Sequence, residues 1–148
     1  MSGEIGQRLL TSGSSFEQTY GYSRAVVVGD EVLISGTTGY DYHTMAMPED
    51  PAEQTRNIYA TFAAVLKEAG GTLADIVRLR TFVTDAAYCA PALKVQGEMF
   101  GDIRPAATIV VVSGLLKPEM KVEIEAEARL SAREKTEAST ALAGVGDL

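Results

Sequence analysis

The sequence predicts an α+β domain in which one mixed sheet carries two helices on a single face. Three observations indicate this fold class. Several segments alternate apolar and polar residues with the period of two that strands show, two others carry an apolar stripe at helical spacing, and their order is strands, helix, strand, helix, strands. Because two amphipathic helices can cover only one face of such a sheet, we expect another subunit to cover the other face.

The first third of the chain predicts short strands and loops. Arg8–Thr11 is expected to form a first strand, and Ser12–Ser15 is a loop by composition. Ala25–Val28 and Glu31–Ser35 flank a Gly-Asp pair, which predicts a hairpin with a two-residue turn. A long connection rich in Gly, Thr and Tyr follows from Gly36 to Met47.

A long amphipathic helix is predicted between Asp50 and Gly70. Asp50 can cap its N-terminus, Pro51 suits the first helical position, and Glu53 can close a capping box. Gly70 is expected to end the helix. One apolar stripe runs along it through Ile58, Phe62, Val65, Leu66 and Ala69.

The second half predicts a strand, a helix and two more strands. In the strand Ile76–Val83, we expect Val77, Leu79, Thr81 and Val83 to share a face. Asp85 is expected to cap a helix that reaches Phe100 and that starts late or kinks at Pro91. The β-branched run Ala107–Val112 predicts a strand buried on both faces, and Glu123–Leu130 is the last strand.

The last strand carries the most informative pattern. Apolar residues from Val122 to Leu130 occupy one face, and three glutamates, Glu123, Glu125 and Glu127, occupy the other. Glutamate is mostly exposed in proteins, so a solvated surface or pairing with Arg78 or Arg80 would explain them. The alternative is one side of a charged site.

Composition limits the possible functions. The chain has 148 residues, of which 46% are hydrophobic and 22% charged, as expected for one globular domain over residues 1–130. Residues 131–148 have no strong apolar period and predict a disordered tail or a short helix. A net charge of −7 argues against nucleic-acid binding, which needs a basic patch.

The sequence also indicates where the protein is located and which cofactors it could hold. No run of apolar residues is long enough to span a membrane, and no signal pattern occurs at the N-terminus, so a cytoplasmic protein is expected. The single Cys89 excludes an internal disulfide and a multi-thiolate metal site. No residue spacing indicates a metal or a cofactor, and we predict neither.

The chain resembles the Rid/YjgF family, small proteins also labelled endoribonuclease L-PSP or reactive-intermediate deaminases. The resemblance covers about Tyr20 to Leu130 and rests on the order and spacing of several motifs: Gly21-Tyr22-Ser23-Arg24-Ala25, Val32-Leu33-Ile34-Ser35-Gly36-Thr37-Thr38-Gly39, Asp75 to Asp85, Arg104-Pro105-Ala106-Ala107-Thr108, and Val122-Glu123-Ile124-Glu125-Ala126. It implies a chorismate-mutase-like fold and a homotrimer with a barrel-like core and clefts between subunits.

The resemblance also implies a set of site residues. Glu123 matches the glutamate that positions a water against an imine carbon, Tyr22 matches the loop tyrosine that closes over the ligand, and Ser35-Gly36 also match the family. The Ser35 hydroxyl and the backbone amides there, with Thr37 beside them, are candidates to hold a carbonyl or carboxylate oxygen of the substrate. The chain departs from the deaminating branch at Ala107, where an arginine holds the carboxylate of a 2-imino acid, and near Leu93, where that branch has an asparagine. Arg104 is a candidate substitute for the missing arginine, with a surface salt bridge as the alternative.

These residues support three hypotheses from different classes. The first is a Rid-like deaminase or hydrolase acting on a small imine, enamine or related C–N metabolite other than a standard 2-imino acid. The second is a non-catalytic trimer that binds a metabolite or a partner. The third, an endoribonuclease or translation inhibitor, is disfavoured by the acidic charge. The lone His43 is either an idle loop residue or part of a lid over the cleft.

Overall fold

Six strands form one mixed sheet in the computed structural model, which describes residues 6–130. Their order across the sheet is β1-β2-β3-β6-β4-β5, and all neighbours are antiparallel except β4 and β5. The predicted mixed sheet is confirmed. The strand bounds are Gln7–Leu10 for β1, Ala25–Val28 for β2, Glu31–Thr38 for β3, Ile76–Val83 for β4, Ala106–Val111 for β5 and Val122–Arg129 for β6.

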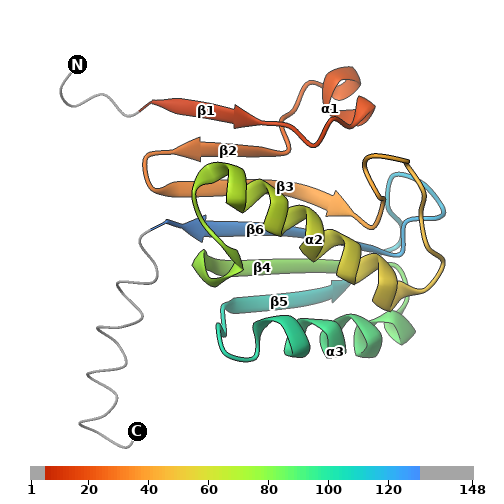
Figure 1. Cartoon of the computed structure of the whole chain (residues 1–148). Helices are drawn as coiled ribbons and strands as arrows, with labels where there is room; N and C mark the ends of the chain where they lie inside the picture. The colour runs from red at the N-terminus through yellow and green to blue at the C-terminus, as the bar shows by residue number, and fades with distance from the viewer. Residues whose placement is uncertain (1–5, 131–148) are drawn as a thin grey trace, which may run out of the picture.

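Two helices pack on the same face of this sheet, as predicted. These are α2, Pro51–Ala69, and α3, Cys89–Phe100 (Figure 1). The core lies between them and the sheet, where β6 contributes alternate residues from Val122 to Ala128. Each large apolar side chain buried there stabilises the fold by about 1.5–3 kcal/mol. The opposite face of the sheet carries Glu123, Glu125 and Glu127.

The bounds of α2 follow from its capping residues. The Asp50 side chain accepts a hydrogen bond from the Ala52 amide at 3.0 Å, and Pro51 occupies the first turn. Gly70 ends the helix with a φ of 95°, a left-handed conformation that favours glycine. The Glu53 carboxylate forms an ion pair with Arg56.

Two details of the helices differ from the sequence prediction. A short helix α1, Ser15–Tyr20, follows β1 where only a loop was expected; the Ser14 side chain caps it by accepting from the Phe16 amide at 3.1 Å. Asp85 caps a single 3₁₀ turn, η2 (Ala86–Tyr88), after which α3 begins. Pro91 therefore falls in the first turn of α3, where its missing N–H breaks no helical bond. A second 3₁₀ turn, η1, spans Leu73–Asp75.

The prediction that residues 107–112 are buried on both faces is wrong for the single chain. β5 is an edge strand, and five of its six residues are exposed, Val110 and Val111 among them. An apolar β-branched run is typical of a strand whose faces are covered. The run does not show whether the strand's own chain supplies that cover. The expected alternation in β4 is also interrupted: a register shift after Ile76 leaves Val77 exposed while Ile76 and Leu79 are buried.

A buried amide fixes the loop between β3 and α2. Gln54 is fully buried; its Nε2 donates to the carbonyl oxygens of Pro48 at 2.8 Å and Glu119 at 3.0 Å, and its Oε1 accepts from the Lys121 amide at 3.0 Å. Gly39 lies directly against Gln54, where a Cβ atom would come within 2.5 Å of the Gln54 Cβ. These contacts join the start of α2 to the loop and to the segment before β6.

Across residues 6–130, no helix combines the length and the apolar character needed to cross a bilayer. The predicted tail, 131–148, lies outside the described residues.

Thr81 and Thr55 allow the cost of a buried hydroxyl to be measured. Both are buried, but Thr81 Oγ1 has no hydrogen-bond partner within residues 6–130, whereas Thr55 Oγ1 donates to the Pro51 carbonyl oxygen at 2.8 Å. We expect Thr81→Val to stabilise the protein by about 1 kcal/mol, because it removes an unpaired polar atom. Thr55→Val should destabilise it by about 1 kcal/mol. Urea denaturation measures both, and equal effects of the two substitutions would contradict the expectation.

Candidate functional site

A β-bulge shapes the end of β3 beside the strand that carries the glutamates. Ile34 pairs with Ala126 and Thr37 pairs with Ile124, so Ser35 and Gly36 together oppose Glu125. Bulges bend a strand and redirect its side chains, and they are common next to active sites. The Ser35-Gly36 segment singled out in the sequence is therefore the point where β3 departs from regular pairing.

Glu123 lies beside this bulge and differs from its two neighbours. A Cβ atom on Gly36 would come within 2.6 Å of the Glu123 Oε2, so only glycine lets the carboxylate approach the β3 backbone this closely. Arg80 forms ion pairs with Glu125 at 3.5 Å and Glu127 at 3.7 Å. Glu123 pairs in register with Thr38 and Phe82 and forms no ion pair among residues 6–130, so the alternative of an ion pair with Arg78 or Arg80 is not found for this glutamate.

The environment of Glu123 favours its protonated form. Burial raises the pKa of the Glu123 carboxyl, the nearby Arg24 charge lowers it, and Glu125 raises it again; the net effect is a raised pKa. A carboxyl group with a raised pKa can exchange protons nearer to neutral pH than an ordinary glutamate.

Arg24 is a buried cation that contacts the bulge. It is only 1% exposed, and its Nη1 donates to the Gly36 carbonyl oxygen at 2.9 Å and to the Thr37 hydroxyl at 3.0 Å. Its guanidinium carbon lies 4.7 Å from the centre of the Tyr42 ring and 5.5 Å from that of Tyr22. Two aromatic faces and three oxygen acceptors (Tyr22 OH at 3.4 Å is the third) thus replace the water that this charge has lost.

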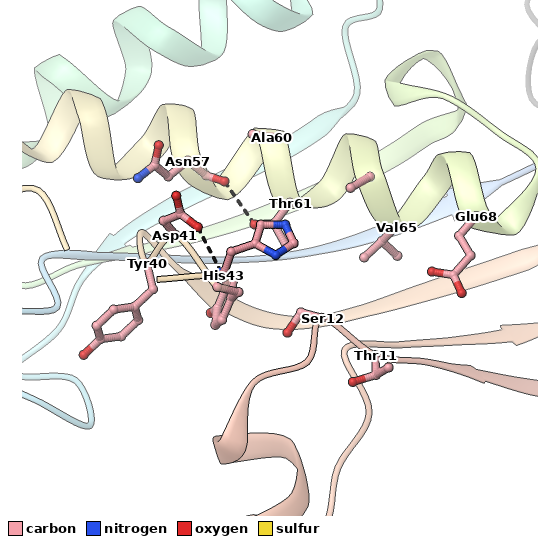
Figure 2. Close-up of a pocket in the computed structure, with 12 residues that line it drawn as sticks. Thr11, Ser12, Tyr40, Asp41, His43, Asn57, Ala60, Thr61, Val65 and Glu68 are labelled. Carbon is pink, nitrogen blue, oxygen red and sulfur yellow. Dashed lines mark hydrogen bonds between the residues drawn. The ribbon is translucent and has the colours of Figure 1, made fainter. Parts of the chain in front are cut away.

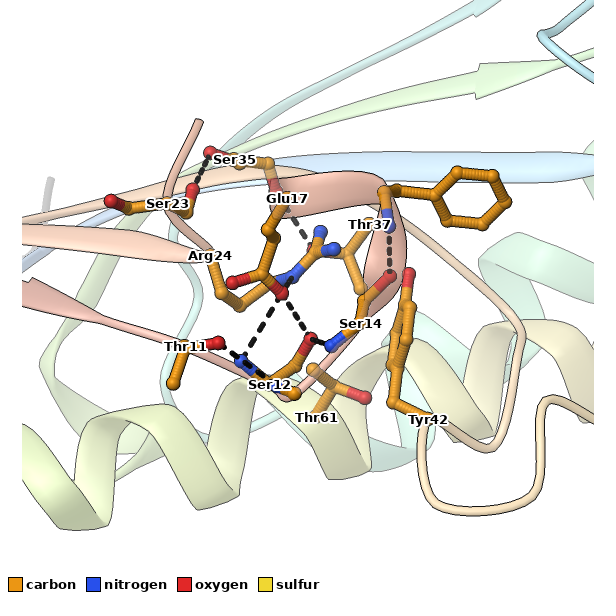
Figure 3. A network of polar contacts seen from close by, with 12 residues as sticks. Thr11, Ser12, Ser14, Glu17, Ser23, Arg24, Ser35, Thr37, Tyr42 and Thr61 are labelled. Carbon is orange, nitrogen blue, oxygen red and sulfur yellow. Dashed lines mark hydrogen bonds and ion pairs between the residues drawn. The ribbon is translucent and has the colours of Figure 1, made fainter. Parts of the chain in front are cut away.

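Glu17 of α1 supplies the counter-charge (Figure 3). Its Oε2 lies 3.5 Å from the Arg24 Nε and accepts hydrogen bonds from the Ser12 hydroxyl and, at 3.2 Å, from the Ser12 amide. Burial alone would raise the pKa of Glu17, but the hydrogen bonds and the Arg24 charge outweigh it, so the net pKa is lowered. The ion pair connects α1 to the start of β2.

The single chain brings five of the predicted site residues close to this network. Gly36 contacts Glu123, and the Tyr22 hydroxyl accepts from Arg24. The Ser35 hydroxyl donates to the Ser23 carbonyl oxygen at 2.6 Å, and the fully buried Thr37 donates to the Ser35 carbonyl oxygen at 2.8 Å. Both hydroxyls are thus engaged in holding the bulge.

Arg104 and Ala107 lie elsewhere in the chain. Ala107 pairs with Leu79, which pairs with Ala126, so it lies two strands away from Glu123 and level with a residue three positions further along β6. Arg104 precedes β5, is exposed and has a φ of 58°. Neither residue is brought next to Glu123 within the single chain.

His43 and Cys89 lie apart from Glu123. His43 lines a cavity on the helix face, with its amide donating to the Asp41 Oδ1 at 2.9 Å. Cys89 is a half-buried free thiol at the start of α3. No group of three or more His, Cys, Asp or Glu residues that could hold a metal ion occurs in the described part of the chain.

Sequence reasoning missed the part played by Arg24, Tyr42 and Glu17. Arg24 stood within a motif used for the family resemblance, but an arginine before a strand is normally exposed. Tyrosines at 22 and 42 were visible, yet their convergence on one cation depends on the β3–α2 loop returning over β2. A basic residue immediately before an apolar hairpin strand, with tyrosines in the flanking loops, was the available signal.

These features define a class: a small α+β domain with a partly dry, unpaired carboxylate at a β-bulge. The sequence profile described as Endoribonuclease L-PSP matches residues 12–130. The chain belongs to this family, which corresponds to the Rid/YjgF proteins that it was seen to resemble.

Individual relatives agree with this assignment. SCO2049 of Streptomyces coelicolor is 31% identical over 121 residues, covering 82% of this chain and 90% of that protein. The crystal structure of Rv2704 from Mycobacterium tuberculosis, a member of the YjgF/YER057c/UK114 family, is 41% identical with a TM-score of 0.77, covering 84% of this chain and 99% of that one. RidA from an Antarctic Psychrobacter is 30% identical with a TM-score of 0.70, over 82% of this chain and 93% of that one.

The electrostatic influence of Arg24 on Glu123 can be tested directly. Arg24→Gln removes the charge that lowers the pKa of Glu123, so that pKa should rise further; Arg24→Lys keeps the charge and should shift the pKa less. A carboxyl-carbon NMR titration measures both values. We expect Arg24→Gln to destabilise the fold by about 3 kcal/mol, since it leaves Glu17 buried and unpaired.

The matched control is Arg129→Gln, which breaks a surface ion pair with Glu31 at 3.1 Å. It should change stability by about 0–1 kcal/mol and leave the Glu123 titration unmoved. An unaltered Glu123 pKa in Arg24→Gln would contradict the electrostatic coupling.

Proposed function

We propose that this chain hydrolyses the C–N bond of a small imine, enamine or related metabolite in a cleft between subunits, with Glu123 as the proton-transfer residue. The observation that carries the proposal is the state of Glu123. It is partly dry, has a raised pKa and forms no ion pair among residues 6–130, whereas Glu125 and Glu127 on the same face share an ion pair with Arg80.

The chemistry needs one group that can take and return a proton. Water attacks the imine carbon and forms a C–O bond, while the C=N electron pair moves to nitrogen. The carboxylate of Glu123 accepts a proton from that water and delivers it to the nitrogen, which gives a carbinolamine. Glu123 then accepts the hydroxyl proton and delivers it to the same nitrogen as the C=O bond forms and the C–N bond breaks. The products are a carbonyl compound and ammonia or an amine. Tyr22 and backbone groups of the Ser35-Gly36 bulge orient the ligand in this proposal.

The substrate differs from a standard 2-imino acid. The position that holds the carboxylate-binding arginine in the deaminating branch is Ala107. Arg24 does not replace it, because its guanidinium is buried and already bonded to Gly36, Thr37 and Tyr22. We therefore propose a less acidic or larger C–N compound, with the exposed Arg104 of a neighbouring subunit as the remaining candidate for an anionic group.

A homotrimer in the cytoplasm is part of the proposal. Leu33 and Val110 are 42% and 41% exposed and lie on the same uncovered face as Glu123, according to their register with Glu127 and Phe82. An uncovered apolar sheet face supports burial against other subunits. Glu123 lines neither of the two cavities described for the single chain, so a neighbouring subunit would have to complete a cleft over it.

Two alternatives remain to be separated from this proposal. A trimer that binds a metabolite without turnover would retain the cleft but show no dependence of any activity on Glu123. The family description carries the name endoribonuclease, but the net charge of −7 opposes RNA binding. Salt-sensitive RNA affinity in the micromolar range would favour that function.

The deciding experiment is an imine-hydrolysis assay on the purified oligomer. An amino-acid oxidase generates 2-imino acids, and semicarbazide traps what remains; neutral imines and enamines are tested in parallel. We expect no acceleration for simple 2-imino acids, acceleration for a less acidic substrate, and a loss of about 10²- to 10⁴-fold in Glu123→Gln. Glu127→Gln, on the same strand and face, is the control and should retain activity. Equal hydrolysis rates in Glu123→Gln and Glu127→Gln would favour the non-catalytic alternative.

The position of the carboxylate is tested by Gly36→Ala. The added Cβ would lie 2.6 Å from Glu123 Oε2, so the flexible end of that side chain must move while the fold persists. A displacement of about 1 Å can lower a rate by about 10²-fold, and we expect a loss of that order with little change in melting temperature. Gly114→Ala, where a Cβ meets nothing within 4 Å, is the control. Full activity in Gly36→Ala would remove Glu123 from the mechanism.

A further inference from the structure

A cavity of about 350 Å³ lies on the helix face of the sheet, on the side opposite Glu123. Its walls come from three segments: the outer side of α2, the β3–α2 loop, and the Thr11-Ser12 segment after β1 (Figure 2). The cavity is therefore separate from the proposed catalytic cleft, and the function proposed above leaves it without a role.

The middle of the cavity is mainly apolar. Ala60, Ala64 and Val65 of α2 form one side, and the Tyr42 ring belongs to the loop on the other. Nearby hydroxyls are already engaged: Thr61 donates to the Asn57 carbonyl oxygen at 3.1 Å, and Ser12 donates to Glu17. The central part thus suits an aliphatic chain in contact with an aromatic ring.

Each end of the cavity carries a carboxylate. Asp41 lies at the end near Asn57, and Glu68 lies at the other end of the same helical stretch (Figure 2). Asn57 and Glu68 are about 16 Å apart along the helix axis, from a rise of about 1.5 Å per residue. Neither Asp41 nor Glu68 forms an ion pair within the described residues; Arg8 reaches this end of α2 by donating to the Glu68 backbone carbonyl oxygen at 2.9 Å.

The charges around the cavity select a ligand class. Its lining contains two carboxylates and no lysine or arginine, which disfavours an anion. Arg24 lies behind Tyr42, 4.7 Å from the ring centre, so a cation against the exposed side of that ring would be repelled. The two carboxylates thus favour positive charge at the ends of the cavity, although Arg8 offsets part of this effect at the Glu68 end, and Arg24 disfavours positive charge in the middle.

From this arrangement we propose that the helix-face cavity binds a linear aliphatic diammonium compound. One ammonium group pairs with Asp41, the other pairs with Glu68, and the alkyl chain lies along Ala60, Ala64 and Tyr42. Such a ligand places three donors against each carboxylate and buries its methylene groups on the apolar middle.

A matched ligand series tests this proposal. Diaminooctane, octylamine and octanediol share one carbon chain and carry two, one and no charges, and diaminobutane is too short to join the two ends. Calorimetry on the full-length assembled protein at low salt should give the tightest binding for diaminooctane, about tenfold weaker binding for octylamine, and no saturable binding for octanediol. Equal affinities for diaminooctane and octanediol would overturn the proposal.

Two protein variants test which carboxylates pair with the ammonium groups of the ligand. Asp41→Asn and Glu68→Gln should each weaken diaminooctane binding by about threefold to tenfold and bring it toward the affinity of octylamine. Asn at position 41 can still accept the hydrogen bond from the His43 amide, so the loop is retained. Asp102→Asn, an exposed carboxylate outside the cavity, is the control and should change nothing.

A third variant places the ligand in the cavity. Ala64→Lys introduces a cation into the apolar middle on an exposed helix position and should abolish diaminooctane binding without unfolding α2, because lysine has good helix propensity. Unchanged affinity in Ala64→Lys, or in both Asp41→Asn and Glu68→Gln, would show that the diamine binds elsewhere and would overturn the proposal.

Discussion

The burial of the Arg24 guanidinium is the constraint on which the rest of the site depends. A buried cation is costly unless opposite charge, aromatic faces and hydrogen-bond acceptors replace its water. Here Glu17 supplies the charge, Tyr22 and Tyr42 supply the faces, and the Gly36 carbonyl oxygen is one of the acceptors. These groups come from α1, the two flanking loops and the bulge of β3. The Arg24 side chain therefore holds four separate segments together.

The three glutamates of β6 differ chemically because they have different neighbours on β3 and β4. Because the bulge inserts one residue into β3, Gly36 lies against Glu123, and its missing side chain leaves room for the carboxylate. Arg80 lies across from Glu125 and also reaches Glu127, but not Glu123. The strand thus presents two carboxylates that share one arginine and a third, Glu123, whose pKa is raised overall because burial outweighs the lowering effect of Arg24.

The fold was largely predictable because its signals are local. Asp50, Pro51 and Gly70 bound α2 through capping, and the Gly-Asp pair sets the β2–β3 hairpin. The failures concern non-local facts. Alternation cannot show the register shifts beside Ile76 and Ser35, and the apolar run in β5 could not show that its own chain leaves it exposed. For the site, the resemblance to the family pointed to Glu123. The role of Arg24 could not be predicted, because its partners lie in loops that meet only in the folded chain.

The sheet separates two chemical environments, and both of them involve the Arg24 side chain. Glu123 faces the uncovered side, where a neighbouring subunit is proposed to close a cleft; the Asp41–Glu68 cavity faces the helix side. Arg24 lies between them, bonded to the carbonyl oxygen of Gly36 on one side and stacked on Tyr42 on the other. A ligand that moves the Tyr42 ring would alter the contacts of Arg24, and Arg24 in turn influences the pKa of Glu123. Because a coupling free energy is reciprocal, any such effect of the cavity on the Glu123 site would be matched by an equal effect of a ligand at Glu123 on the cavity.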